Sequence, residues 1–295
     1  MVQHRTVGRT LFTAANYAFL AVLALLCVLP VVNVLAVSLS ESYYVTAGLV
    51  KLWPRGFSFK SYEFVSQTPE FLRSLWVAVQ RVALGGALNM ILTIVVAYPL
   101  SKETGQLKGR TLYVWLFVFT MLFSGGLIPS YVIVQELHLL DTIWSLVLPG
   151  AVPIFNVILL LNFFRSLPRE LEEAAHIDGA SHMQTLIKLI VPLSKPALAT
   201  IALFTIVGHW NEWFNGLIYM NRPENYPLAS YLQTVIIQRD IMLTADPSMM
   251  AQLAELNNRS VKAAQIFLGA LPVFCVYPFL QRYFMTGIVM GSVKE

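Results

Sequence analysis

Apolar residues in this chain gather in long continuous runs that are separated by polar segments. Five of the runs contain no charged residue, and the run that follows Pro196 is interrupted only by Glu212 before its apolar character resumes. Most of the runs reach the roughly 20 residues that a helix needs to cross about 30 Å of hydrocarbon. The pattern therefore predicts six transmembrane helices. Their expected ranges are 11–39, 72–101, 111–135, 142–165, 196–220 and 263–286.

The fold class that follows is an all-α membrane protein, with residues 1–295 forming a single transmembrane domain. Isolated strands are excluded because lipid cannot satisfy hydrogen bonds at an open edge, and the runs lack the alternation of barrel strands. Composition agrees with this class. The chain is 57% hydrophobic and 12% charged, with a mean hydropathy of +0.65, which is outside the range of ordinary water-soluble domains. Gly125 and Gly126, in the third run, predict close helix approach or a bend.

The charge and the cysteine content limit which partners and which covalent or metal sites can be expected. The net charge of +4 is small and dispersed, so we expect membrane lipid and no nucleic acid as a partner. Cys27 and Cys275 both fall within predicted helices and lack the spacing of metal ligands, so no metal site or disulfide is expected. The N-terminal run is too long for the core of a signal peptide, and we interpret it as a retained first helix.

Basic residues predict the orientation in the membrane. They precede the first run, crowd the loop after the second and surround the segment 168–195, whereas the short turn 136–141 has none. The residues in question are Arg5, Arg9, Lys102, Lys108, Arg110, Arg165, Arg169, Lys188 and Lys195. Both termini and the segment 168–195 are therefore expected in the cytosol, and the loops 40–71 and 221–262 outside the cytoplasmic membrane.

The segment 168–195 has the pattern of two short helices that dock on a cytosolic partner. Positions Arg169 to Asp178 place small and apolar residues on one side of a helix, and Gly179 predicts a left-handed C-terminal cap. Ser181 followed by Gln184 has the spacing of a capping box and predicts the start of a second helix. Pro192 and Pro196 are expected to bound that helix at its far end.

Two charged residues lie within or near the predicted bilayer, where a charge is costly enough to suggest a function. Arg81 is expected deep in the second helix, where it either snorkels to the interface or bonds to neighbouring helices. Glu212 lies toward the outer end of the fifth helix, and either lines a polar cavity or sits at the interface between two tryptophans. The other polar residues around Glu212 are His209, Asn211 and Asn215.

The segment 168–195 resembles the EAA loop of permeases in binding-protein-dependent ABC importers. In that pattern Glu-Ala-Ala is followed after three residues by Gly and then, after nine more, by Ile-x-Leu-Pro. Here Glu173, Ala174 and Ala175 precede Gly179, and the sequence Leu189 to Pro192 ends the pattern with two conservative departures. Other stretches, among them Trp210 to Trp213, resemble the smaller six-span subunit of the maltose-permease-like carbohydrate family, especially permeases for complex oligosaccharides such as pectin-derived or alginate-type saccharides.

The resemblance implies a type I ABC importer permease in the bacterial cytoplasmic (inner) membrane. It implies a heterodimer with a second homologous permease, two ABC ATPase subunits and an extracytoplasmic solute-binding protein. The loop would couple to the ATPases through Glu173, Ala174, Ala175, Asp178, Gly179 and Pro192, with Glu173 pairing with a basic residue and Asp178 capping the turn. The C-terminal tail, including Gly291, Lys294 and Glu295, is expected to insert between the ATPases.

The chain has no GxxxxGK[ST] phosphate loop and no HExxH or GxSxG motif. We therefore expect a non-catalytic subunit that binds no cofactor itself, with ATP and Mg²⁺ held by the partner ATPases. An ion- or proton-coupled secondary transporter that uses Arg81 and Glu212 is the alternative. It lacks support from an inverted repeat, and it leaves the EAA pattern unexplained. A membrane enzyme is disfavoured by the missing catalytic motifs.

Overall fold

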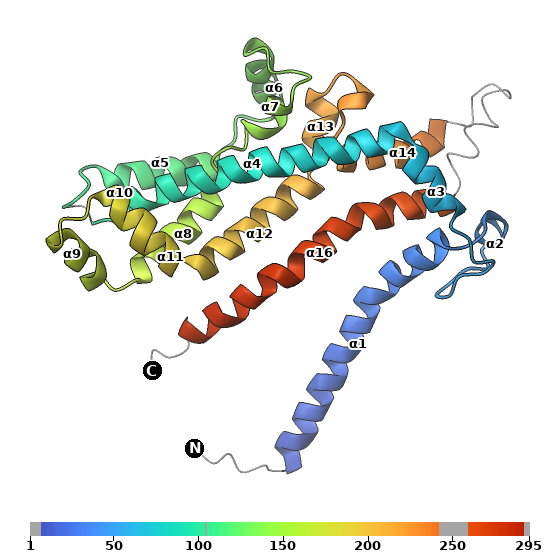
Figure 1. The fold of residues 1–295 in the computed structure, drawn as a ribbon, viewed down its shortest axis with the longest axis horizontal. Helices are drawn as coiled ribbons and strands as arrows, with labels where there is room; N and C mark the ends of the chain where they lie inside the picture. Colours follow the sequence, from blue (N-terminus) through green and yellow to red (C-terminus); the bar gives the residue numbers. More distant parts are fainter. Residues whose placement is uncertain (1–6, 104, 242–258, 292–295) are drawn as a thin grey trace. The chain divides into compact units, whose positions relative to one another are not determined.

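The computed structural model describes residues 7–103, 105–241 and 259–291, and these residues are helical apart from their connections and one isolated bridge between Ser40 and Phe57 (Figure 1). The chain divides into two compact units, one made of residues 1–71 and 234–270, the other of residues 72–233 and 271–295. The all-α class is confirmed. Because the candidate site lies in the second unit, that unit carries most of the argument below.

The first unit begins with α1 (Val7–Ser38), whose side chains are exposed along most of its length. After it come α2 (Ser42–Thr46) and α3 (Lys60–Gln67). Ala36, Val45 and Val50 form a small core there, and Ser38 Oγ lies 2.7 Å from Tyr62 Oη. The loop 40–71 is therefore a folded segment that packs on the end of α1.

Three helices in the described residues are long and apolar enough to cross a membrane: α1, α4 (Pro69–Ser101) and α16 (Arg259–Gly291). The number rises to five if each of two bent helix pairs counts as one span. One pair is α5 (Arg110–Leu122) with α6 (Leu127–Glu136), and the other is residues 182–193 with α12 (Lys195–Asn211). The short apolar helix α8 (Ile154–Ser166) is a further candidate, and the count of six stays a prediction.

Three of the expected spans are divided in the structure. The third bends by 109° between α5 and α6, at the segment that contains the two glycines, which favour helix interiors least after proline. The fourth is split into α7 (Ile143–Val147) and α8, with Pro153 immediately before α8. The fifth ends α12 at Asn211 and resumes as α13 (Phe214–Tyr219). Two further elements, η2 (Pro223–Asn225) and α14 (Leu228–Ile241), follow.

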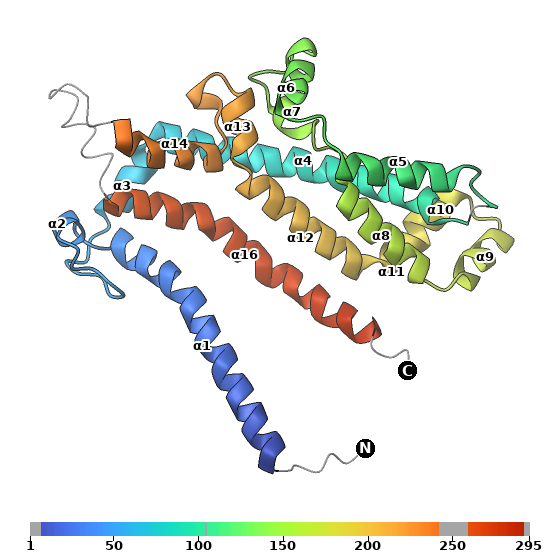
Figure 2. The ribbon, with the colours of Figure 1, turned by 180° about the vertical axis from the view of Figure 1, so that it is seen from behind.

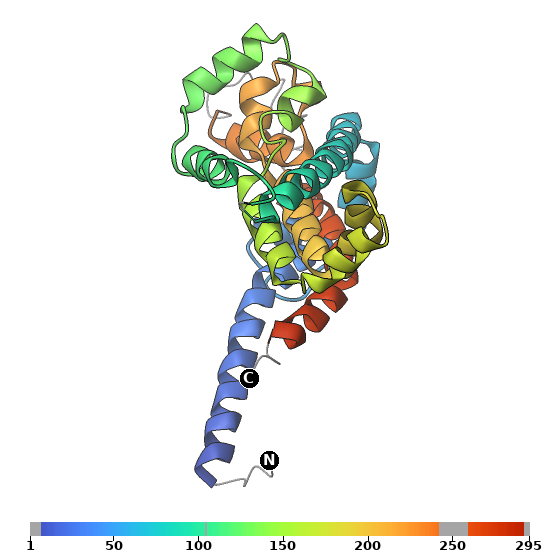
Figure 3. The ribbon, with the colours of Figure 1, turned by 90° about the vertical axis from the view of Figure 1, so that its left-hand side faces the viewer.

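Within the second unit, α4, α8 and α12 lie side by side, which is visible from both faces (Figures 1 and 2). Their shared core joins the C-terminal part of α4 to α8, to the helix that precedes α12, and to α12 itself. Its buried residues are Ala97, Tyr98, Leu100, Val157, Leu160, Leu161, Phe164, Leu186, Ile190, Ala197 and Ile201. In lipid, such close packing stabilises helix association through van der Waals contact rather than through the hydrophobic effect. Figure 3 views this end of the unit head-on.

Gly85 of α4 lies directly against the His209 side chain of α12. A Cβ atom at Gly85 would lie 2.6 Å from His209 Cε1 and 2.7 Å from Nε2, distances that real Cβ atoms do not adopt. At the neighbouring Gly86 the nearest atom, Thr205 Cγ2, would be 3.9 Å away, which is ordinary contact. The two glycines are therefore suited to a paired comparison, because an alanine would clash at Gly85 but fit at Gly86.

We expect Gly86→Ala to be neutral or to raise the free energy of unfolding by up to about 1 kcal/mol, because alanine favours a helix more than glycine does. We expect Gly85→Ala to be less stable than Gly86→Ala by about 2 kcal/mol, because it pushes the His209 ring away from its hydrogen-bond partner. Denaturant titration in detergent micelles measures both. Equal stabilities would show that α4 and α12 do not pack closely at this point.

Candidate functional site

The segment 168–195 begins with α9 (Glu170–Ile177), a helix with no buried residue. Gly179 follows it at φ +80°, so the left-handed cap that the sequence predicts is confirmed. The turn is closed by backbone hydrogen bonds, among them Ala180 N–H to the Ala175 carbonyl at 2.9 Å. Asp178 was expected to cap this turn, but its exposed side chain makes no hydrogen bond to any described residue. A side chain also spans the turn, since His176 Nδ1 lies 3.1 Å from the Ala180 carbonyl oxygen.

The second helix of the segment starts at the expected capping box. Ser181 Oγ accepts from Gln184 N–H at 3.3 Å, and Ser181 N–H donates to Gln184 Oε1 at 2.9 Å. The helix runs through α10 (His182–Thr185), the π-helical turn η1 (Leu186–Ile190) and α11 (Val191–Leu193).

The helix ends at Leu193, between Pro192 and Pro196, the two prolines that were expected to bound it. Pro192 lies in its last turn, directly after the π turn, which relaxes the spacing between backbone donors and acceptors. The bend of 82° to α12 comes at Ser194.

The surface of this segment is apolar as well as charged. Ile177 is 86% exposed, Met183 60% and Ile187 59%. Glu173 and Ala174 are exposed as well, and Ala175 is half-buried. Large apolar side chains so exposed next to small ones are typical of a contact surface for another protein.

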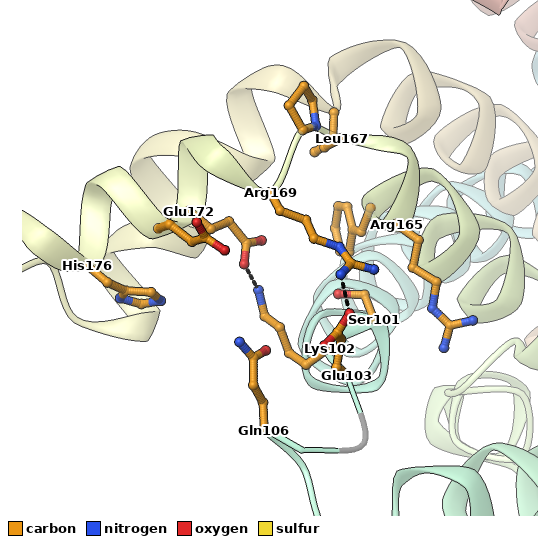
Figure 4. A pocket seen from close by; sticks show the side chains of 12 residues that line it. Ser101, Lys102, Glu103, Gln106, Arg165, Leu167, Arg169, Glu172 and His176 are labelled. Atoms are coloured by element: carbon orange, nitrogen blue, oxygen red, sulfur yellow. Dashed lines mark hydrogen bonds and ion pairs between the residues drawn. The ribbon is translucent and has the colours of Figure 1, made fainter.

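Ion pairs join α9 to the residues that follow α4. Lys102 pairs with Glu172, and Arg169 pairs with Glu103 (Figure 4). The paired side chains line a cavity of about 120 Å³. Arg165 Nη2 also donates to the Leu100 carbonyl, at 3.1 Å. The sequence analysis did not identify Lys102, Glu103 or Glu172 as site residues, because charges in loops are common and their partners lie about 70 positions away in the chain.

Arg81 and Glu212 form a second site, at the break between α12 and α13. The Arg81 side chain is only 2% exposed, and its Nη2 lies 2.5 Å from Glu212 Oε2. Its Nη1 donates to the Glu212 backbone carbonyl at 2.8 Å, and Glu212 Oε1 accepts from Asn215 N–H at 2.8 Å. Of the two alternatives for Arg81, bonding to a neighbouring helix is the one observed. The guanidinium satisfies a carbonyl that the helix break exposes.

A second hydrogen-bonded group lies further along α4. Asn89 Nδ2 donates to the carbonyls of Gly150 and Ala151, at 2.8 and 2.9 Å, in the connection between α7 and α8. Its Oδ1 lies 2.8 Å from His209 Nε2. The two carbonyls fix which end of the Asn89 side chain is Nδ2, and an amide oxygen can only accept, so His209 Nε2 carries the proton in the bond to Oδ1. Asn89 was missed, and the signal for it was a polar residue in the middle of an uncharged run.

The remaining residues named from the sequence are not brought together. Asn211 is exposed at the end of α12, and its side chain makes no hydrogen bond to a described residue. Gly291 is the last residue of α16, and Lys294 and Glu295 lie outside the described residues. In the part of the chain that the structure describes, no three His, Cys, Asp or Glu side chains are placed to share a metal ion.

Long apolar helices, a buried ion pair at a helix break and an exposed two-helix segment together define a multi-span subunit of a membrane transport system. The chain belongs to the family of binding-protein-dependent transport system inner membrane components, which matches residues 74–289. Members of this family are transport components rather than catalysts, and they lie in the inner membrane. The resemblance to permeases of binding-protein-dependent ABC importers, which was inferred from the sequence, is confirmed.

Related proteins match over almost the full length of the chain. Protein LplC of Bacillus subtilis (strain 168) is 40% identical over 291 residues, which are 99% of this chain and 97% of LplC. The polygalacturonan/rhamnogalacturonan transport system permease protein YtcP of the same organism is 39% identical, over 96% of this chain and 98% of YtcP. A chain in the crystal structure of a bacterial ABC transporter involved in the import of the acidic polysaccharide alginate has a TM-score of 0.86 and 31% identity. The match covers 96% of this chain and 100% of that one.

We expect Arg81→Met to lower the free energy of unfolding by about 3 kcal/mol, because it leaves the Glu212 carboxylate without its buried partner. The double variant Arg81→Met/Glu212→Leu removes both charges, and we expect it to recover most of the loss. Denaturant titration in mixed micelles compares the two. If the double variant is as unstable as Arg81→Met, the two side chains stabilise the unit independently. Arg81 and Glu212 would then not act as a pair at the helix break.

Proposed function

We propose that this chain is a permease subunit of an ATP-driven importer that takes up oligosaccharides from an extracytoplasmic solute-binding protein. The observation that carries the proposal is the exposed segment 168–195, whose Gly179 turn and capping box separate two short helices that carry the EAA pattern. Large exposed apolar residues on both helices give an ATPase subunit a surface to bind. Membership of a binding-protein-dependent transport family supports the same assignment.

Saccharides rich in uronic acids are the substrate class we favour. YtcP is named for polygalacturonan and rhamnogalacturonan transport, and the similar solved structure is of a transporter for alginate, an acidic polysaccharide. A more distant relative, MdxG of Bacillus subtilis, is named for maltodextrin transport and is 27% identical. All three names concern chains of linked sugars, and the two proteins with higher identity to this chain are named for saccharides that contain uronic acids.

Six crossings of the membrane, with both termini in the cytosol, complete the proposed architecture. The three long helices, the bent pair of α5 with α6, the helix α8, and α12 with α13 would supply them. The helix α8 has 13 residues, so it spans about 20 Å at 1.5 Å per residue, and the connection from α7 would complete that crossing. The segment 168–195 would then lie on the cytosolic side, where the ATPases are.

In this arrangement the ATPase subunits hold ATP and Mg²⁺ and dock on α9 and α10, while a second homologous permease forms the translocation path together with this chain. Glu173, exposed on α9, would pair with a basic residue of the ATPase. Ala174 and Ala175 are small enough to let α9 enter a cleft, and the tail from Gly291 would contact the ATPases as well. ATP-driven closure would move the helices between inward- and outward-facing states.

We expect Gly179→Asp to uncouple ATP hydrolysis from transport. A Cβ at Gly179 has no atom within 4 Å in this chain, so the substitution leaves the protein's own packing intact and alters only the docking surface and the φ of +80°. In proteoliposomes that contain the whole transporter, uptake of labelled oligogalacturonide per ATP hydrolysed should fall about tenfold or more.

Gly48→Asp is the matched control for this variant. Gly48 also adopts positive φ, +70°, and also has no atom within 4 Å of a built Cβ, but it lies in the first unit, remote in sequence from the docking segment. We expect it to transport normally. Normal coupling in Gly179→Asp, or an equal loss in both variants, would rule out a specific role for the Gly179 turn.

A further inference from the structure

The helix α9 is joined to the rest of the chain by non-helical links at both ends. Leu167, which precedes Pro168, is extended, with φ −71° and ψ 146°, as is usual for a residue before proline. At the other end, Gly179 interrupts the helix with positive φ. No residue of α9 is buried. A displacement of α9 therefore passes to the rest of the unit through the hydrogen-bonded turn to α10 and through side-chain contacts of α9, rather than through a continuous helix or a buried apolar face.

The ion pair between Lys102 and Glu172 is the least exposed attachment of α9. The Lys102 side chain is 13% exposed and that of Glu172 is 23% exposed. Lys102 Nζ also lies 4.0 Å from the centre of the Tyr98 ring, so the ammonium group is held between a carboxylate and an aromatic face. Tyr98 itself is only 7% exposed and belongs to the core of α4, α8 and α12. Glu172 is thus attached, through Lys102 and Tyr98, to the shared core of α4, α8 and α12.

The second ion pair, between Arg169 and Glu103, differs in its exposure. Its side chains are 72% and 59% exposed, and pairs so open to water and salt contribute little. Two cavities lie beside the Lys102–Glu172 pair, of about 120 and 580 Å³, and Lys102, Gln106, Glu172 and His176 line both. The ion pair is therefore the main contact that holds α9 against α4, with open space on either side of it.

Nearer its N-terminus, α4 also holds the break between α12 and α13, through the ion pair of Arg81 with Glu212. Arg81 lies in α4 and Lys102 is the residue that follows α4. The two are 21 positions apart, which corresponds to about 30 Å of helix. The helix α4 thus carries the attachment to the helix break, and the residue that follows it carries the attachment to α9.

We propose that Lys102 and Glu172 are positioning residues that fix α9 to α4, so that α4 receives the displacement of α9 and transmits it to the Arg81–Glu212 break. The source of the displacement rests on the proposed function, because it is the ATPase that would move α9. The attachment of α9 to α4 does not depend on that function, and the two can be tested separately.

The test is the distance between spin labels on α9 and α4. Labels are attached at Glu170→Cys, exposed in the first turn of α9, and at Ile91→Cys, 59% exposed on α4, after Cys27 and Cys275 are replaced by serine. The assembled transporter in lipid nanodiscs is measured without nucleotide and after trapping with ATP and vanadate. We expect one narrow distance, unchanged between the two states to within about 2 Å, because α9 and α4 move together.

Three variants distinguish positioning from a merely structural role. Glu172→Gln should broaden the distance distribution and shift it by about 5 Å, one helical turn, in the trapped state, while the thermal midpoint of the complex stays close to that of the parent. The charge exchange Lys102→Glu/Glu172→Lys should restore the narrow distance. Arg169→Gln, which removes the exposed pair, should leave it unchanged.

A narrow, unchanged distance in Glu172→Gln would overturn the proposal, and so would a large change between states in the parent protein. Failure of the ATPases to assemble on this chain would contradict the proposed function instead. In that case the spin-label distance in the nucleotide-free permease still tests whether the ion pair holds α9. If it does, Glu172→Gln must broaden the distance distribution there.

Discussion

The buried pairing of Arg81 with Glu212 is the interaction on which the second unit depends. Where α12 stops and α13 has not yet begun, backbone groups lose their helical partners in a region where water is scarce. Arg81 satisfies the Glu212 carbonyl and neutralises its carboxylate, and that carboxylate in turn accepts from the first turn of α13. Removing the Glu212 charge leaves the Arg81 guanidinium buried alone, and removing Arg81 leaves the partly exposed Glu212 carboxylate without its partner. The break, the ion pair and the orientation of α13 therefore form one cooperative arrangement.

This constraint makes α4 the organising helix of the unit. Along its length, Arg81 supports the break, Gly85 lets His209 approach, and Asn89 satisfies two carbonyls between α7 and α8. Its C-terminal part then packs into the core with α8 and α12, and the next residue, Lys102, contacts α9. A permease must change shape without exposing unsatisfied backbone groups to lipid. An element that holds its neighbours by specific polar contacts at several depths allows them to move as rigid bodies.

Local rules in the sequence predicted the local geometry well. The left-handed Gly179 and the Ser181 capping box depend only on residues a few positions apart, and both are present. Arg81 and Glu212 were recognisable as unusual because charges are rare in apolar runs, but their pairing across 131 positions required the fold. The bend of 109° between α5 and α6 lies at Gly125 and Gly126, where a bend was one of the two outcomes expected from the sequence. The π turn before Pro192 was not predicted, because tertiary packing decides where a helix departs from regular geometry. The pairing of Lys102 with Glu172 was not predicted either, because the two residues are 70 positions apart in the chain.

The central claim is that this family member imports saccharides at the expense of ATP, with the energy delivered through the segment 168–195. Uptake of a labelled oligogalacturonide into vesicles that contain the complete transporter and its binding protein tests this most directly, with ATP and the ion gradient removed in turn. Our account predicts that uptake stops when ATP is depleted and continues when an ionophore collapses the gradient. Uptake that persists without ATP and is lost with the gradient would contradict it, and would identify Arg81 and Glu212 as parts of an ion-coupled carrier instead.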